Sequence, residues 1–467
     1  MAVIDLSEPF DVVVAGGGNA ALCAAITAAH GGARVIVLEA APAFYRGGNT
    51  RHTRNLRCAH DGSAPNMAGP YHEAEFLDDL YRVTAGQTDK DLAKLTIARS
   101  TELIRWMGEQ GVLFQPPLGG TLSLGKTNAF FLGGGRGQLN TLYRRAEALG
   151  VVALYDTPIT SLTIEDGYFM SAAVAHEGRA RSLRGRALVA AAGGFEANID
   201  WLKQYWGAPA DNFLIRGTPY NRGDVLRMLL DAGVQAVGDP TQCHAVAIDA
   251  RAPKYDGGIA TRLDSVVFGI VVNRDCKRFY DEGEDTWPKR YAIWGRLVAQ
   301  QPDQIAYSII DSRSIHLFMP SIFPAVKANS IPELAVKLKL NPAALEKTVA
   351  EFNAAVKPGS FDHTVLDDCR TEGLAVNKTH WARTISEPPF CGYPLRPGIT
   401  FTYLGVRVNS EARMLMENGK PSANMYAAGE IMAGNVLGKG YLAGIGMTIG
   451  AVFGRIAGEG AAVHERN

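Results

Sequence analysis

The sequence predicts an α/β fold in which one domain is built from two chain segments and a second, α+β domain is inserted between them. The 467 residues exceed what one ordinary core needs, so two domains are expected. Short apolar stretches end in glycine clusters near both termini and once in the first half of the chain, and this pattern is absent from about residue 241 to about residue 395. Segments at 90–110 and 138–150 are compatible with helices. We therefore expect a first segment at 1–240, an inserted domain at 241–395 and a returning segment at 396–467.

The first element is the stretch DVVVAGGGNAALCAAITAAHGGARVIVLEA at residues 11–40. Its β-branched opening predicts a buried parallel strand, its alanine-rich centre predicts a helix at 20–30, and ARVIVLEA predicts a second strand that ends at Glu39. An acid at that place can accept hydrogen bonds from a ribose diol. The order of strand, glycines, helix, strand and acid predicts a Rossmann-like dinucleotide-binding unit.

The small residues between the first strand and the helix have separate tasks. Gly16, Gly18 and Ala21 occupy the G-x-G-x-x-G/A positions. Glycine at the first position permits a tight turn, glycine at the second lets the backbone approach a pyrophosphate, and alanine at the third lets helix and strand pack closely. The N-terminus of the helix that follows attracts the phosphate charge.

Further glycine clusters favour FAD over NAD as the dinucleotide. They are RGGNT at 46–50, AAGGFEAN at 191–198, and AAGE followed by GIGMTIG within 427–450. A strand, an acid and a glycine-opened helix near the C-terminus suit closure over a flavin, because a helix N-terminus stabilises the negative charge of a reduced ring. The predicted cofactor contacts are Gly16, Gly18, Asn19, Ala20, Glu39, Gly48, Asn49, Thr50, Ala192, Gly193, Gly429, Glu430, Gly446, Met447 and Thr448.

The overall composition restricts the partners. Lys and Arg together number 47, as do Asp and Glu, so no net charge points to nucleic acid. The six cysteines are dispersed without a C-x-x-C pair, so no metal site is expected. Neither a signal peptide nor an apolar run of about 18 residues is visible, which predicts a cytoplasmic protein; peripheral docking at the inner membrane through a partner stays open.

On these motifs the chain resembles the fumarate reductase/succinate dehydrogenase flavoprotein family over nearly its whole length. The segments GGNTRHTRNLRCAHDG, DPTQCHAVAIDARAP, DEGEDTWPKRYAIWGRLVAQQP and AGEIMAGNVLGKGYLAGIGM are more specifically similar to its tricarballylate-oxidising members. The resemblance implies a capping domain over a Rossmann-like FAD-binding domain. It also implies oxidation of a saturated carbon–carbon bond in a small polycarboxylate, tricarballylate to cis-aconitate, with electrons passed to a membrane-associated iron–sulfur or haem protein.

Basic residues are the expected substrate contacts, because a guanidinium binds carboxylates bidentately and keeps its charge. The segment TRHTRNLR places Arg51, His52, Arg54 and Arg57 directly after the GGNT cluster, and at least one of them is expected to contact substrate or FAD. The alternative interpretation is a solvated basic loop. The resemblance adds His244, which matches a family histidine that binds a substrate carboxylate; the alternative for it is a core histidine.

The resemblance also assigns an acid/base arginine. NRDCKRFYDE at 273–282 matches the family's N-R-x-G-K-R-F-x-N-E, and the arginine that follows it corresponds here to Arg290, with Lys289 as the neighbouring alternative. A surface Lys–Arg pair is the competing interpretation. Because the pKa of arginine lies above about 12, such a base needs burial beside cations and a carboxylate relay, which Glu282 or Glu284 could form.

The chain departs from the family at two substrate-binding positions. Phe401 stands in the frame of a second histidine, and Tyr441 lies near the place of a C-terminal arginine. Lys439, Tyr403 and Tyr441 are the candidates that compensate, and the two tyrosines are rival bases of the kind found in 3-ketosteroid dehydrogenases. Three alternative functions stay open: a fumarate reductase-like enzyme, a 3-ketosteroid dehydrogenase-like enzyme, and a non-catalytic flavin module that relays electrons.

Overall fold

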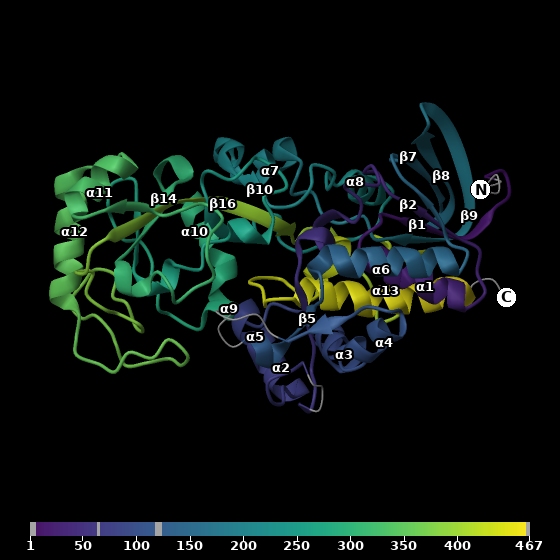
Figure 1. Cartoon of the computed structure of the whole chain (residues 1–467). Coiled ribbons are helices and arrows are strands. Elements are labelled where there is room, and N and C mark those ends of the chain that lie inside the picture. Colours follow the sequence, from purple (N-terminus) through teal and green to yellow (C-terminus); the bar gives the residue numbers. More distant parts are fainter. Residues whose placement is uncertain (1–5, 63–65, 117–123, 464–467) are drawn as a thin grey trace.

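The computed structural model describes residues 6–62, 66–116 and 124–463, and it confirms the predicted α/β class. Figure 1 shows two halves side by side. Chain from both ends of the sequence forms the half that carries the N- and C-termini, and chain from the middle of the sequence forms most of the other.

A central sheet organises the first half. Its strands are β1 (Phe10–Ala15), β2 (Val35–Leu38), β6 (Val152–Leu154), β7 (Ile159–Glu165), β8 (Tyr168–His176), β9 (Arg179–Ala190), β18 (Arg413–Leu415) and β19 (Pro421–Ala427). The order is β18-β19-β9-β1-β2-β6, and β7 and β8 extend it antiparallel from β9. β1 is parallel to both neighbours, so Val13 lies opposite Ile36 and Leu188. β19 adds in parallel to β9, which brings the C-terminal segment beside the predicted N-terminal unit.

Helices at one face of this sheet approach one another closely. They are α1 (Asn19–His30), α6 (Gly134–Ala148) and α13 (Ile445–Val463). A Cβ at Gly454 would lie 2.5 Å from the carbonyl oxygen of Ala20, and one at Gly458 would lie 2.4 Å from that of Ala24. Glycine in α13 is therefore what lets its backbone contact the backbone of α1.

A small sheet and several helices lie below this pair in Figure 1. They are β3 (Asn55–Arg57), β4 (Phe114–Gln115), β5 (Asn128–Phe131), α2 (Glu73–Thr84), α3 (Lys90–Ser100), α4 (Leu103–Glu109) and α5 (Leu124–Thr127). The helix expected at 90–110 is interrupted at Thr101 and Glu102, which separate α3 from α4. β5 pairs antiparallel with both β3 and β4, and this pairing fixes the basic segment that contains β3.

A second sheet organises the other half. Its strands are β10 (Leu214–Ile215), β12 (Cys243–Asp249), β13 (Ile270–Asn273), β14 (Ala306–Ile310), β15 (Val326–Ala328) and β16 (Phe390–Thr402). β16 is its central strand, because it pairs with β10, β12, β14 and β15. Opposite Phe401 of β16 lies His244 of β12, where a bulge follows. The expected boundary at residue 395 falls within β16, so the domain limits stay a prediction.

Helices pack around the second sheet. The helices are α7 (Ile199–Trp206), α9 (Trp287–Arg290), α10 (Trp294–Ala299), α11 (Ile331–Leu338) and α12 (Pro342–Ala355). Helix α8 (Asp224–Asp231) instead lies beside β7 and β17 of the first half, where β17 (Gly405–Val406) pairs with β11 (Ala236–Val237). Figure 1 shows α11 and α12 at the end of the molecule farthest from the central sheet.

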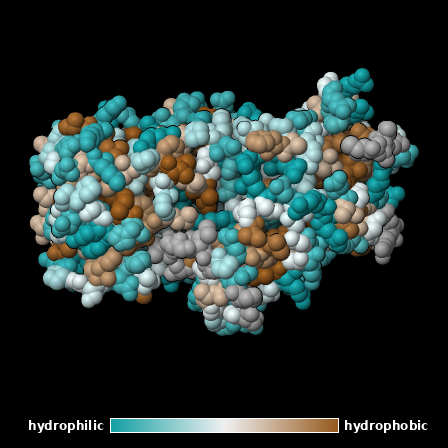
Figure 2. All heavy atoms as spheres, viewed as in Figure 1, coloured by the Kyte–Doolittle hydropathy of each residue, from teal (hydrophilic) through white to brown (hydrophobic). Residues whose placement is uncertain are grey.

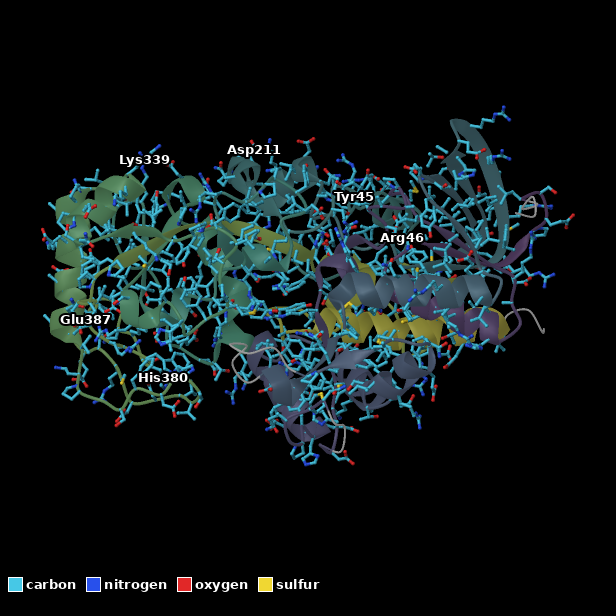
Figure 3. The ribbon with its side chains drawn as sticks, in the orientation of Figure 1. Tyr45, Arg46, Asp211, Lys339, His380 and Glu387 are labelled. Carbon is cyan, nitrogen blue, oxygen red and sulfur yellow. The ribbon has the colours of Figure 1, made fainter. Side chains whose placement is uncertain are left out.

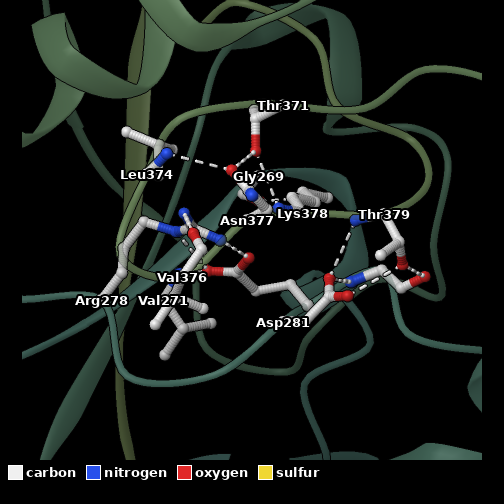
Figure 4. Close-up of polar contacts among 12 residues, drawn as sticks. Gly269, Val271, Arg278, Asp281, Thr371, Leu374, Val376, Asn377, Lys378 and Thr379 are labelled. Carbon is white, nitrogen blue, oxygen red and sulfur yellow. Dashed lines mark hydrogen bonds and ion pairs between the residues drawn. The ribbon is translucent and has the colours of Figure 1, made fainter.

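The long connection between α12 and β16 is held to the second half by buried polar contacts (Figure 4). Lys378 is fully buried, and its Nζ donates to the carbonyl oxygens of Val267 and Gly269 at 2.7 and 2.6 Å. Arg278 donates to the carbonyl oxygen of Val376 at 2.5 Å. These contacts anchor the connection to the rest of the second half, and the one to Val376 also satisfies a backbone carbonyl of the connection.

Side chains of both polarities are interspersed over the two halves on the face shown in Figure 2. Figure 3 shows Tyr45 and Arg46 near the junction of the halves, whereas Lys339 and Glu387 lie in the second half, away from that junction. Within the described ranges, none of the helices combines the length and the apolar character that spanning a bilayer requires.

The burial of Lys378 predicts a pH-dependent contribution to stability. Burial lowers the pKa of Lys378 from 10.5 to about 8. The unfolded chain therefore binds more protons than the folded chain between these values, so the free energy of unfolding due to this residue rises with pH across that window. Relative to Lys378→Met, we expect the wild type to gain about 3 kcal/mol between pH 8 and 10.5, measured by denaturant unfolding. The exposed Lys347→Met serves as the control, and an equal gain over both variants would contradict the prediction.

Candidate active site

A cavity extends from the glycine turn after β1 to Thr400 and Phe401, near the C-terminal end of β16. Its walls combine the ends of β1, β2 and β9 with the N-termini of α1 and α13. Predicted cofactor contacts line it throughout its length. These are Gly16, Gly18, Asn19, Ala20, Glu39, Gly48, Asn49, Thr50, Ala192, Gly193, Gly429, Glu430, Gly446 and Met447.

The turn between β1 and α1 leaves no space for side chains. Gly16 has φ +104°, and a Cβ there would lie 2.4 Å from the carbonyl oxygen of Ala191. Gly18 caps α1 without a side-chain hydrogen bond, and the first N–H of the helix, that of Asn19, donates to Thr50 Oγ1 at 3.0 Å. Such a turn at a helix N-terminus suits a pyrophosphate.

Glu39 is fixed at the end of β2. Its Oε1 accepts a hydrogen bond from the backbone N–H of Ala41, and its Oε2 accepts one from that of Gly47, both at 2.9 Å. Burial raises the pKa of Glu39. The carboxyl group lines the cavity beside the glycine turn, where it can meet a ribose.

The N-terminus of α13 faces the same cavity. Asn19 in the first turn of α1 donates from Nδ2 to the carbonyl oxygen of Met447 at 3.0 Å, which joins the first turns of the two helices. Thr448 differs from the prediction: its hydroxyl donates to the carbonyl oxygen of Arg57, and it does not line the cavity. Its neighbours Gly446 and Met447 provide the cavity wall instead.

Positive charge concentrates at the opposite end of the cavity. Arg54 is 7% exposed and donates from Nη1 to the sulfur of Met319 at 2.7 Å, whereas its Nε and Nη2 are buried without a hydrogen-bond partner among the described residues. Burial, with a contribution from Arg262, lowers the pKa of Arg54 to about 10. A thioether is a weak acceptor for a cation, so this guanidinium is poorly satisfied.

Two more arginines complete this cationic end, which we define as Arg54, Arg216 and Arg262. Arg216 donates from Nε to the carbonyl oxygen of Gly258 at 3.2 Å and from Nη1 to Thr400 Oγ1 at 2.9 Å. Burial, with a contribution from Arg262, lowers its pKa to about 10. Arg262 contacts both carboxylate oxygens of Asp264, at 2.6 and 2.7 Å.

Three rings complete the wall at this end. The rings of His244 and Tyr441 are stacked at 4.0 Å, and Tyr291 meets His244 edge-on at 5.4 Å. Nδ1 of His244 is buried without a partner in the described chain, and the backbone of Ala292 hydrogen-bonds the imidazole. Burial and the charges of Arg216 and Arg262 hold the pKa of His244 well below its usual value. The ring is therefore neutral at neutral pH.

The start of the predicted basic segment lies beside the cationic end. His52 lines the cavity, and its Nε2 lies 2.7 Å from Asp256 Oδ1. Burial lowers the pKa of His52 to about 4. Arg51 donates to the carbonyl oxygen of Phe44 at 2.6 Å, and it is not among the residues that line the cavity.

Besides Arg51 and Thr448, four further predicted site residues lie off the cavity wall. Arg57 is buried and donates to Tyr71 Oη at 2.6 Å, so its guanidinium makes contacts within the core and not with the cavity. Arg290 pairs with Glu284 at 2.6 Å. Tyr403 donates to a backbone carbonyl at 2.5 Å, which leaves its hydroxyl occupied. Lys439 is the fourth of these residues.

At the cationic end and among the rings beside it, sequence reasoning missed Arg216, Arg262 and Tyr291. Arg216 reaches the cavity because β10 pairs with the distant β16, and no local motif marks it. Arg262 follows the quoted segment DPTQCHAVAIDARAP by several residues, and Tyr291 directly follows the predicted Arg290. The sequence-based prediction came within one residue of Tyr291, because it chose the half-buried, ion-paired Arg290 and not the ring that follows it on the cavity wall.

Comparison with known proteins agrees with this geometry. Residues 11–447 match the family described as "FAD binding domain". "NADH:acrylate oxidoreductase" of Vibrio harveyi is 25% identical over 98% of this chain and 50% of its own length. "Probable fumarate reductase Ifc3" of Shewanella frigidimarina is 25% identical over 98% of this chain and 76% of its own length.

A solved structure, the open conformation of a flavocytochrome c3 fumarate reductase, has a TM-score of 0.76 and 22% identity over 99% of this chain and 80% of its own. That likeness shows the fold. The chain spans about half the length of the first relative above. Neither relative is named for tricarballylate, so that substrate is not established.

The cofactor is FAD, as predicted. The glycine turn, the N-terminus of α1 and Glu39 are the features that fit its phosphates and ribose. Within the described ranges, no group of His, Cys, Asp and Glu is placed to hold a metal ion.

The glycine turn yields a direct test. Gly16→Ala should abolish FAD retention, because the new Cβ meets the Ala191 carbonyl at a positive φ. Gly32→Ala is the matched control: Gly32 also has a positive φ, +91°, but its Cβ would meet nothing within 4 Å. The control should lose about 1 kcal/mol of stability and keep its flavin. Flavin absorbance of the purified proteins measures the difference, and a fully loaded Gly16→Ala would overturn the assignment.

Proposed function

The chain belongs to the FAD-binding family that it matches over residues 11–447, and on that premise we propose that it is an oxidoreductase acting on a carbon–carbon bond of a small polycarboxylate. The proposed reaction is the oxidation of tricarballylate to cis-aconitate. The observation that carries this proposal is the cationic end, where, among the described residues, only Arg262 of the three buried guanidinium groups is ion-paired, with Asp264.

The guanidinium groups differ in what they offer a substrate. Nε and Nη2 of Arg54 form one edge of the guanidinium, and both lack a partner, so this edge suits a bidentate carboxylate. Arg216 keeps its Nη2 without a hydrogen bond among the described residues. Arg262 is held by Asp264 and acts mainly through its charge. A ligand with two or three carboxylates relieves the repulsion among these cations.

FAD, when bound, would supply the hydride acceptor that this oxidation requires. A proton must leave the adjacent carbon, and we assign its acceptance to Nδ1 of His244, which is neutral and unpartnered. A bound carboxylate adds negative charge beside the ring and raises its pKa, which makes Nδ1 a better acceptor. Stacking on Tyr441 restricts the orientation of the imidazole.

Arg290 remains the alternative proton-transfer group, acting with the Glu284 carboxylate that it contacts. We prefer His244 because Arg290 does not line the cavity. Tyr441 is the second alternative, since its hydroxyl accepts from the Gly446 N–H at 3.1 Å and keeps its own proton to donate.

The cationic end also distinguishes among the three alternative functions. A steroid carries no charge to satisfy three guanidinium groups, so the cationic end argues against a 3-ketosteroid dehydrogenase-like activity. A pure electron relay would leave that end without a ligand. A fumarate reductase-like reaction uses the same carboxylate contacts in the opposite direction and is the second candidate. For the electrons released on oxidation, we propose a membrane-associated iron–sulfur or haem protein as acceptor.

The substrate proposal is tested with FAD-loaded protein and an artificial acceptor dye. Tricarballylate should reduce the dye, and Arg54→Ala should raise KM on the order of 100-fold, because a desolvated charge-assisted contact contributes about 3 kcal/mol. Arg274→Ala, which removes an arginine of the second half that does not line the cavity, is the control and should keep the wild-type KM. If no di- or tricarboxylate reduces the dye, the proposed reaction is wrong. If KM is unchanged in Arg54→Ala, Arg54 does not bind the substrate.

The base assignment is tested separately. His244→Asn should lower kcat by about 100-fold or more, the size expected for loss of a general base, with a smaller effect on KM. Because the pKa of His244 is held low, the acid limb of wild-type kcat/KM should show no inflection near pH 6.5. The steady-state rate as a function of pH provides the measurement. Full activity in His244→Asn together with loss in Arg290→Ala would transfer the role to Arg290.

A further inference from the structure

Two buried carboxyl groups lie on the cofactor side of the cavity, apart from the cationic end. Glu196 follows the glycine cluster after β9 and is fully buried. Glu430 follows Gly429, lines the cavity and is 9% exposed. Among the described residues neither carboxyl forms an ion pair with a lysine, arginine or histidine. Two acids without a counter-cation are costly to bury when both are ionised.

The donors around the pair are neutral. Oε1 of Glu196 accepts hydrogen bonds from the side-chain amides of Asn49 and Asn221, the latter at 2.7 Å. Oε1 of Glu430 accepts from the backbone N–H of Thr402 at 2.8 Å and from its hydroxyl at 3.3 Å. Each Oε1 is therefore satisfied by groups that carry no charge.

The surroundings of Glu196 Oε2 indicate that either Glu196 or Glu430 is protonated. Oε2 is buried and receives no donor from elsewhere in the described chain, while the carboxyl of Glu430 lies within hydrogen-bond reach. Two carboxylates cannot hydrogen-bond one another, because an ionised carboxylate only accepts. One carboxylic acid facing one carboxylate satisfies both groups and removes the repulsion between like charges.

The expected titration agrees with this geometry. Burial raises the pKa of Glu196 to about 7. Burial and then the neighbouring Glu196 raise the pKa of Glu430 well above its usual value. The surroundings do not offset this with charge: Tyr441 is in electrostatic reach of Glu430, and the guanidinium of Arg216, which follows β10, donates to Thr400 of β16 and to neither carboxyl.

We propose that Glu196 and Glu430 share a single proton and form a titrating site on the wall of the FAD cavity. Release of that proton takes the pair from one negative charge to two. FAD carries phosphate charge of the same sign, so the doubly ionised pair binds it more weakly. By linkage, bound FAD retains the proton. This site is separate from the substrate-binding cations and does not depend on which polycarboxylate they bind.

Infrared spectroscopy of the wild-type protein tests the shared proton without any substrate. At pH 7 the spectrum should contain the C=O stretch of a buried protonated carboxyl, and this band should disappear at alkaline pH. Its absence at pH 7 would overturn the proposal. Because this measurement needs no variant, it stands even if a substituted protein fails to fold.

Single substitutions separate a shared proton from an isolated buried acid. In Glu196→Gln and in Glu430→Gln the remaining carboxyl gains an amide donor and loses its like-charged neighbour, so the band should be lost in both. Glu346→Gln, an exposed position on α12, is the control and should keep it. Loss in one variant and persistence in the other would show a proton that belongs to one residue alone, which contradicts sharing.

FAD titration of apoprotein supplies the second readout. The wild-type Kd for FAD should rise with pH as the pair loses its proton, by up to about tenfold for each unit by which FAD raises the pKa of the pair. Both glutamine variants should lack that rise, whereas Glu346→Gln should retain it. Parallel pH profiles in all four proteins would exclude coupling between the pair and FAD. Neither result depends on turnover, so failure here is distinguishable from failure of the proposed reaction.

Discussion

The close backbone contact between α1 and α13 is the constraint on which the rest of the site depends. Gly454 and Gly458 let the helices touch, and Asn19 then joins their first turns through the carbonyl oxygen of Met447. Two helix N-termini from opposite ends of the chain thus face one cavity. Partial positive charge from both helices favours an anionic or reducible group there. The cofactor site is therefore a product of helix packing as much as of the glycine turn.

Charge is distributed along the cavity with a definite polarity. Cations gather where the second half meets the cavity, and carboxyl groups gather beside the cofactor residues. β16 connects the two regions: Thr400 accepts from Arg216, and Thr402 donates to Glu430. Because desolvation strengthens both sets of interactions, each region favours a ligand or a proton that compensates its charge. An anionic substrate at one end and a shared proton at the other each reduce the cost of burying groups of like charge.

The cofactor half of the site could be predicted from sequence because its determinants are local. The strand at residues 11–15, the helix after it and Glu39 follow from one continuous pattern, and the predicted contacts other than Thr448 line the cavity. The cationic end could not be predicted in full. Arg216 depends on pairing between strands far apart in sequence, and Arg54 was one of several basic residues that local composition does not distinguish.

β16 also limits how this protein can change over evolution. Its side chains alternate between two faces, so insertion or deletion of one residue before Thr400 would exchange the outward and inward sets along the rest of the strand. Arg216 and Glu430 would lose their threonine partners in the same event, and His244 would face a different neighbour. Length variation is therefore expected to accumulate in the irregular connection after α12, while the length of this strand is held constant.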